Sequence, residues 1–362
     1  MPASKPKSAA RAKTPPTPAE SLDALRRRES VRNGLMRIGR RHAAVALQRI
    51  EHPKKTDRTE DIHQVRVHGK RLRALLRLLK PVTDVEAVTR ENLRLQEMGR
   101  SLSGFRDAFV AGETLKRVFE DTAPRRMRDA ARMLGVKPHA ARARSKEDLD
   151  LALKNAAKTL RHVADEFRNL PISARGWASI APGLEKSYRR ARAGYKRCVR
   201  RGAGHLGDCF HTWRKRVKDL GYQLEILDNL KPGEVHRQRK EFRRLGALLG
   251  DDHDYVVFAA HVREREQHYE DLANFQPVRK RLKRRLKTLR AKEFAVARNL
   301  FGEKPRLWIT RLYDSWRMWK NPDATGLVIT VERAESASAI PPRSLGAPQP
   351  ILTSSDQTPG AK

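Results

Sequence analysis

Apolar residues recur every three or four positions along most of the chain, which is the spacing of one face of an α-helix. Ala, Leu, Arg and Lys dominate these stretches, and proline falls mainly at the breaks between them, where its missing N–H costs least. The predicted fold class is therefore all-α, and 326–331 is the one candidate strand. The pattern predicts helices over 20–50, 59–80, 84–121, 146–170, 183–202, 208–230, 233–270, 275–302 and 304–320.

An internal repeat organises these helices. Residues 62–70 read IHQVRVHGK, and residues 210–218 read FHTWRKRVK. Further along, 102–107 (LSGFRD) aligns with 249–254 (LGDDHD) at nearly the same separation. A repeated unit of this length predicts that a bundle of four helices occurs twice in the chain.

Composition and the repeat together divide the chain into four parts. Residues 1–18 and 321–362 are rich in Ser, Ala, Thr and Pro and lack apolar periodicity, so we expect a disordered basic tail at the start and a mostly disordered tail at the end. The first four-helix bundle is predicted over 19–172. The second is predicted over 173–320, together with one additional C-terminal helix.

The repeated segments carry a stripe of cations on one helix face. At about 100° per residue, the basic residues of the first copy fall within an arc of about 80°, opposite a face of valine and leucine. The second copy repeats the arrangement over a shorter length, because Gly221 stands where the first copy has an arginine. The first stripe comprises His63, Arg66, Lys70, Arg73 and Arg77, and the second comprises His211, Arg214 and Lys218 with Lys215 beside them.

The length of the first stripe suits an extended ligand. It spans about 21 Å at the helical rise of 1.5 Å per residue. Arginine offers forked donors to phosphate oxygens, and a histidine crowded by cations is expected to gain its charge when a phosphate arrives. The alternative is a solvated basic face, which the repetition of His-x-x-Arg-x-x-x-Lys makes less favoured.

Two further sets of polar residues are candidates for the same site. Arg189, Arg192 and Lys196 share one face of the helix predicted at 183–202, and they either contact the ligand or are simply solvated. Asp107 and Asp254 lie at equivalent positions of the repeat, where a carboxylate either orients a neighbouring cation or caps a helix.

The charge balance points to a polyanionic partner. Lys and Arg number 78 against 42 Asp and Glu, which gives a net charge of +36. Inorganic polyphosphate, nucleic acid and an anionic membrane surface would each relieve the self-repulsion of such a chain. The sequence has no apolar run of transmembrane length and only two cysteines, so we expect a cytoplasmic protein that does not enter the membrane.

Two motifs that suggest other chemistry are set aside. Residues 202–207 match G-x-G-x-x-G but follow a basic helix rather than a strand, so no dinucleotide cofactor is expected. Cys198, His205, Cys209 and His211 fit no common zinc spacing, and we expect no metal site. Clustered carboxylates for phosphoryl transfer are not evident, which argues against an enzyme.

Taken together, these segments resemble the CHAD family of helical domains. The resemblance rests on the repeated His-Arg-Lys segments, on Leu102–Asp107, on Tyr188–Lys196 and on Leu245–Asp254, and it extends from about residue 25 to about 305. It implies two four-helix bundles related by a pseudo-twofold axis, with basic side chains converging on a central cleft or pore that binds inorganic polyphosphate. The residues expected at such a site are His63, Arg66, Lys70, Arg73, Arg77, Arg106, Arg189, Arg192, Lys196, His211, Arg214, Lys215, Lys218 and His253, with Asp107 and Asp254 as orienting carboxylates.

The function expected from the sequence is non-catalytic polyphosphate binding, with targeting to polyphosphate granules as a consequence. The alternative is a non-specific nucleic-acid-binding protein of the nucleoid, for which the net charge is fair evidence. Low aromatic content, 6%, and the lack of a recognisable DNA- or RNA-binding motif count against that alternative.

Overall fold

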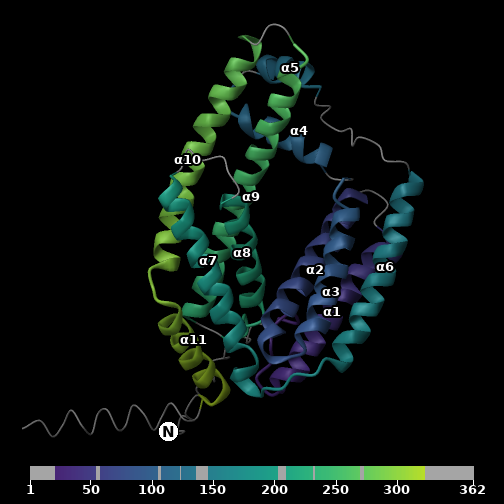
Figure 1. The fold of residues 1–362 in the computed structure, drawn as a ribbon, viewed down its shortest axis with the longest axis vertical. Coiled ribbons are helices and arrows are strands. Elements are labelled where there is room, and N and C mark those ends of the chain that lie inside the picture. Colours follow the sequence, from purple (N-terminus) through teal and green to yellow (C-terminus); the bar gives the residue numbers. More distant parts are fainter. Residues whose placement is uncertain are drawn as a thin grey trace, which may run out of the picture. The chain divides into compact units, whose positions relative to one another are not determined.

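The all-α prediction is confirmed. The computed structural model describes residues 21–53, 58–104, 107–122, 124–135, 146–202, 209–230, 233–269 and 273–322, and these ranges contain eleven α-helices, three short 3-10 helices and no strand (Figure 1). The candidate strand and both predicted tails, apart from residues 321 and 322, lie outside the described residues. The α-helices are α1 (Val31–Glu51), α2 (Arg58–Leu79), α3 (Val85–Ser101), α4 (Asp107–Val118), α5 (Pro124–Met133), α6 (Lys146–Asn169), α7 (Ala181–Arg201), α8 (Cys209–Glu225), α9 (Glu234–Glu266), α10 (Gln276–Phe301) and α11 (Pro305–Lys320). The 3-10 helices are η1 (Lys80–Val82), η2 (Gly176–Ser179) and η3 (Ala273–Phe275).

Local capping moves two of the predicted boundaries. Helix α1 begins eleven residues later than predicted, because the Ser30 hydroxyl accepts a hydrogen bond from the Asn33 N–H at 3.1 Å and so starts the helix there. The single helix predicted at 84–121 is wrong. The chain leaves the helix at Leu102, where the Ser103 N–H turns back to the Arg100 carbonyl, and it resumes as α4. Helix α5 was not predicted at all.

Four helices of the first half pack in a ring, which we call the N-terminal helix group: α1, α2, α3 and α6. Helix α1 contacts α2 and α6, and α3 contacts the same two helices. Their facing leucines, valines and Phe167 are buried, which follows from the apolar periodicity of each helix. At Gly39 an added Cβ would lie 2.6 Å from the Phe167 ring, so α1 and α6 approach closely there.

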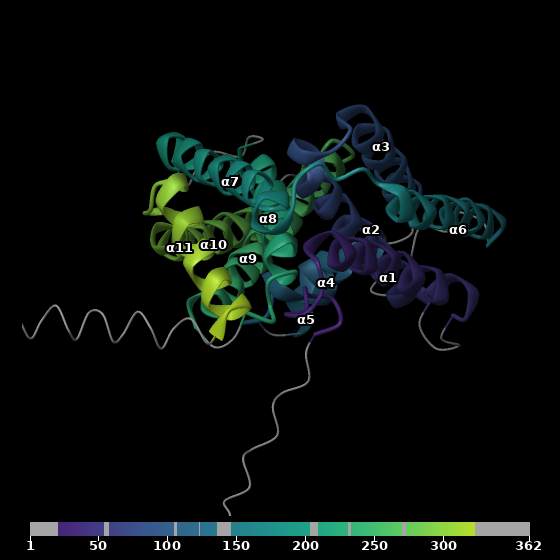
Figure 2. The ribbon, with the colours of Figure 1, turned by 90° about the horizontal axis from the view of Figure 1, so that it is seen from below.

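Helices α7, α8, α9 and α10 form the C-terminal helix group. Helix α8 packs between α7 and α9, and α10 contacts both α9 and α7 (Figure 2). Trp213 of α8 is fully buried at the centre of this group. Helix α11 packs on α7, where the Trp308 ring stacks on Tyr188 at 4.3 Å between centroids.

Helices α2 and α8 join the two groups. The Gln223 side-chain amide donates to the Ala74 carbonyl at 2.9 Å, and both lie in the contact between α2 and α8. One continuous apolar core runs through both groups. The division of the chain into two bundles at 172/173, and their relation by a pseudo-twofold axis, stay predictions.

A second, separate apolar core lies where α4 and α5 meet the far ends of α9 and α10, and we call this the end cluster. Its buried members include Phe119, Leu134, Phe258 and Phe275. Figure 1 shows α4 and α5 beside these ends of α9 and α10. Two helices from the first half of the sequence therefore complete a core with helices from the second half. None of the described helices is long and apolar enough to cross a bilayer.

Candidate functional site

The stripe on α2 is held by polar partners on α3 and α8. The Arg73 guanidinium donates to Asn92 at 3.2 Å and to Gln96 at 2.7 Å, both on α3. The Arg66 guanidinium reaches the carbonyl of Leu102, at the end of α3, at 3.2 Å. Burial, followed by the neighbouring Arg77, lowers the pKa of Arg73 to about 10, so the side chain still carries its charge at pH 7.

The stripe on α8 lies beside α9. The Nδ1 atoms of His211 and His253 are 3.2 Å apart, which requires one ring to donate and the other to accept. The Lys218 ammonium nitrogen lies 3.8 Å from the position that a Cβ would take at Gly250. Burial, followed by Arg214 and His211, lowers the pKa of His253 to about 4. His253 is therefore neutral at pH 7.

Between the two stripes, α2 and α8 are joined by ion pairs. The Arg71 guanidinium donates to Glu225 at 2.9 Å and lies 5.7 Å from the ring centre of Tyr222. The Arg77 guanidinium donates to Asp219 at 2.7 Å. The structure thus places Arg66 and Arg73 of the α2 stripe against α3 and Arg77 against α8. The α8 stripe lies against α9, and the shared central cleft stays a prediction.

A pocket lined by cations lies where α2, η1 and α3 meet α7 and α8. We call it the basic pocket, and its volume is about 210 Å³. Thr89, Asn92 and Ser187 supply neutral polar groups, and the ammonium of Lys80 donates to the Thr89 hydroxyl at 2.8 Å. Its charged lining residues are Arg77, Lys80, Lys186, Arg190, Arg216 and Asp219.

The electrostatics of the basic pocket favour an anion. Five cations face a single carboxylate, and that carboxylate, Asp219, already accepts from Arg77 and is only 16% exposed. Burial raises the pKa of Asp219, while Arg77 and Arg216 act in the opposite direction. The remaining positive charge is concentrated in a partly enclosed space, where it interacts more strongly than on an open surface.

The face of α7 that sequence reasoning selected is not the face that lines the basic pocket. Arg192 donates to the Phe301 carbonyl at 2.9 Å and so satisfies the end of α10. Arg189 donates to Glu185 at 2.5 Å on its own helix, and Lys196 is exposed. Lys186 and Arg190, four residues apart on α7, line the pocket instead. Their spacing was visible in the sequence, but nothing in the sequence told which basic face meets α2.

The candidate carboxylates are only partly described. Asp254 accepts a hydrogen bond from Arg117 of α4 at 3.2 Å, and Arg117 also pairs with Asp251. These ion pairs fasten α4 to α9. Arg106 lies outside the described residues, as does the side chain of Asp107, although Asp107 begins α4. The orienting role of both carboxylates stays a prediction.

A second histidine pair was missed by the sequence reasoning. His42 of α1 and His68 of α2 are buried, with their Nδ1 atoms 3.2 Å apart. Burial is the main cause that lowers the pKa of His42 to about 3 and that of His68 to about 4. Asp23, 4.0 Å from the Nδ1 of His42, opposes the shift. Both rings are neutral at pH 7 and join α1 to α2.

The fold and the site define an all-α protein with a cation-lined pocket at the junction of two helix groups. Across the described residues, no three His, Cys, Asp or Glu side chains are grouped so as to hold a metal ion. The family model described as "CHAD domain" matches residues 37–263, which is more than half of the chain and runs from within α1 to within α9. The chain belongs to the CHAD domain family. A comparison with curated proteins finds no match.

Proposed function

We propose that this protein binds inorganic polyphosphate without chemically changing it, and that the basic pocket anchors the polymer. The observation that carries the proposal is the convergence of five cations on one small space, from helices as far apart in the sequence as α2 and α8. Membership of the CHAD domain family, which is associated with polyphosphate binding, supports the same ligand. Recruitment to polyphosphate granules in the cytoplasm is the consequence that we propose for the cell.

Arg77 gives the pocket a connection to the α2 stripe. It belongs to the stripe predicted from the sequence and also lines the basic pocket. A linear polymer can place one phosphate in the pocket and successive phosphates along α2, with about 5 Å gained per helical turn. Each contact adds a charge-assisted hydrogen bond, so affinity should rise with chain length until the stripe is filled.

Binding is favoured over catalysis by the composition of the pocket. Phosphoryl transfer needs groups that activate a nucleophile or hold metal ions. The basic pocket offers one carboxylate, Asp219, and its partner Arg77 already occupies it. The residues of the pocket therefore neutralise charge without supplying a base.

The size of the pocket also separates polyphosphate from duplex DNA. A duplex presents its phosphates along the outside of a wide rod, and such a rod cannot enter a space of about 210 Å³. A single chain of phosphates can enter. A duplex would have to bind the exposed cations of the surface. Each of these cations would then contribute about equally to the affinity for DNA.

The test compares two double variants of α7 that lose the same charge. Lys186→Gln with Arg190→Gln removes two cations of the pocket, whereas Arg197→Gln with Arg200→Gln removes two exposed cations outside it. Affinity for long-chain polyphosphate and for duplex DNA is measured at equal phosphate concentration and at moderate salt. We expect the pocket variant to bind polyphosphate about tenfold more weakly and the control to change by less than about threefold.

Three results would overturn the proposal. Equal losses of polyphosphate affinity in both double variants would mean that only net charge matters. Preferential retention of DNA by the wild-type protein would favour the nucleic-acid alternative. A parallel assay measures release of inorganic phosphate from polyphosphate, and release that the pocket variant abolishes would indicate an enzyme instead.

A further inference from the structure

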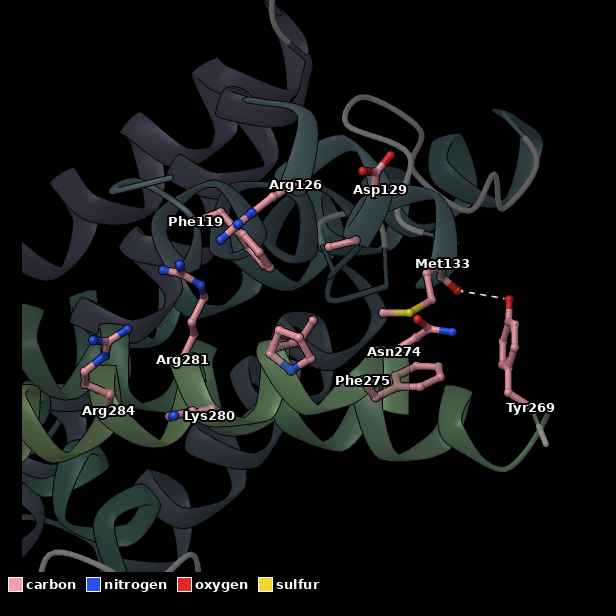
Figure 3. Close-up of a pocket in the computed structure, with 13 residues that line it drawn as sticks. Phe119, Arg126, Asp129, Met133, Tyr269, Asn274, Phe275, Lys280, Arg281 and Arg284 are labelled. Carbon is pink, nitrogen blue, oxygen red and sulfur yellow. Dashed lines mark hydrogen bonds between the residues drawn. The ribbon is translucent and has the colours of Figure 1, made fainter. Parts of the chain in front are cut away.

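The end cluster contains a larger pocket of different character, which we call the end pocket. It has a volume of about 800 Å³ and lies between α5 and the first turns of α10 (Figure 3). Its floor is apolar, with Phe119, Phe275 and Val278 buried and Met133 half-buried. The Tyr269 hydroxyl donates to the Met133 carbonyl at 3.1 Å and fastens α5 to the segment that follows α9. A pocket of this volume is large enough to hold a small molecule.

Four cations surround this apolar floor. Arg126 comes from α5, and Lys280, Arg281 and Arg284 come from α10. Among the described residues, none of the four forms an ion pair. The one carboxylate in the lining, Asp129, pairs weakly at 3.8 Å with an arginine outside the pocket.

Neighbouring arginines on the same helix behave differently. Arg279 pairs with Glu266 at 3.4 Å, and Arg285 pairs with Asp121 at 2.7 Å. Lys280, Arg281 and Arg284 line the pocket, and among the described residues they form no such pair. Arg281 lies over the Phe119 ring at 5.5 Å, so one cation already touches the apolar floor.

The two kinds of lining occupy different ends of the pocket. Figure 3 shows Arg281 and Arg284 on α10 facing Arg126 from α5 at one end, while Met133 and Phe275 lie toward the other end, near Tyr269. A ligand with an anionic group at one end and an apolar body at the other matches this polarity. Inorganic polyphosphate does not, because it has no apolar part to cover Met133 or the Tyr269 ring.

We propose that the end pocket binds a soluble amphipathic anion, of the class of alkyl phosphates. The anionic head contacts the arginines contributed by α5 and α10, and the alkyl body covers the half-buried Met133 and the exposed ring of Tyr269. This site is independent of the basic pocket, which lies among other helices and has a polar lining.

The experiment titrates the full-length protein by calorimetry with octyl phosphate below its micelle concentration. Inorganic phosphate tests the head alone, and octyl glucoside tests the alkyl body without charge. We expect octyl phosphate to bind at least about tenfold more tightly than either comparison ligand, because the site needs both parts. The proposal would be overturned if inorganic phosphate bound as tightly as octyl phosphate. It would also be overturned if octyl glucoside bound as tightly as octyl phosphate.

A matched pair of variants locates the head group. Arg281→Gln with Arg284→Gln removes two cations of the end pocket, and Lys283→Gln with Lys287→Gln removes two exposed cations from the same helix. We expect octyl phosphate affinity to fall about tenfold in the first variant and to change by less than about twofold in the second. Equal losses in both variants would overturn the assignment.

A third variant locates the alkyl body. Met133→Trp places a large ring into the pocket from a half-buried position, and circular dichroism checks that helical content is kept. We expect it to abolish octyl phosphate binding and to leave polyphosphate binding unchanged. If octyl phosphate affinity survives in this folded variant, the proposed pocket is wrong.

Discussion

Glu293 of α10 is a buried acid that forms no ion pair within the described part of the chain. Its side chain is fully buried, and neither carboxyl oxygen makes a hydrogen bond to a described residue. Arg290, a cation whose charge acts on Glu293, pairs with Asp252 at 2.6 Å and lies 4.0 Å from the centre of the Phe210 ring. Burial, reinforced by Asp252, raises the pKa of Glu293 to about 9, so its carboxyl is protonated at pH 7.

This shift costs stability in a defined pH window. Between its ordinary pKa of 4.5 and about 9, the folded protein holds a proton on Glu293 that the unfolded chain has lost. Stability therefore falls as pH rises through this window, by about 1.4 kcal/mol per pH unit. At pH 7 the cost is about 3 kcal/mol, and at pH 5.5 it is about 1 kcal/mol.

Glu293→Gln should remove this cost while keeping nearly the same volume. We expect the variant to be more stable than the wild type by about 3 kcal/mol at pH 7, with a smaller gain at pH 5.5 and a larger one at pH 8. Urea unfolding at the three pH values measures the difference, and Glu264→Gln, at a side chain 73% exposed, is the control. A difference that is the same at all three pH values would refute the reasoning, because it would mean that Glu293 is ionised in the folded protein.

Three further predictions concern packing and buried polar groups. Gly183→Ala would bring a Cβ to 2.0 Å from the Leu78 carbonyl oxygen and should lower the free energy of unfolding by about 3 kcal/mol. Gly99→Ala has open space around it and should raise the free energy of unfolding by about 1 kcal/mol. Chemical denaturation measures both variants, and equal free energies of unfolding would contradict the prediction. Tyr188→Phe loses the hydroxyl that reaches the Leu300 carbonyl of α10 at 3.0 Å and the Glu303 carbonyl, between α10 and α11, at 3.1 Å. The change should cost about 1 to 2 kcal/mol of stability, measured by thermal unfolding, and an unchanged melting temperature would refute the role. The pKa of His42 is lowered to about 3, so the wild-type fold loses stability as pH falls below 6.5. Between pH 6 and 4, the loss of stability in His42→Gln should be smaller than that of the wild type by about 1.4 kcal/mol per pH unit. Urea unfolding measures this difference, and the same pH dependence in both proteins would contradict the prediction.

The elements of this protein were largely readable from its sequence, because helix formation depends on local spacing. Apolar residues at helical intervals predicted the all-α class, and the cations of α2 fell on one face by the same arithmetic. The break between α3 and α4 was missed, since a helix ends where a few backbone groups find other partners. Apolar periodicity alone does not reveal that point.

Only the tertiary structure decides which groups each charged side chain contacts. A helical wheel orders residues around one helix but does not tell which neighbour each face meets. Arg192 therefore became a partner of the Phe301 carbonyl, whereas Lys186 and Arg190 joined the basic pocket. Packing also decides which cations meet a carboxylate, as in the pair that Arg77 forms with Asp219. The sequence by itself determines how much charge the protein carries. Ion pairing and burial depend on residues that are distant in sequence, so the packing of the helices determines which of these charges can contact a ligand.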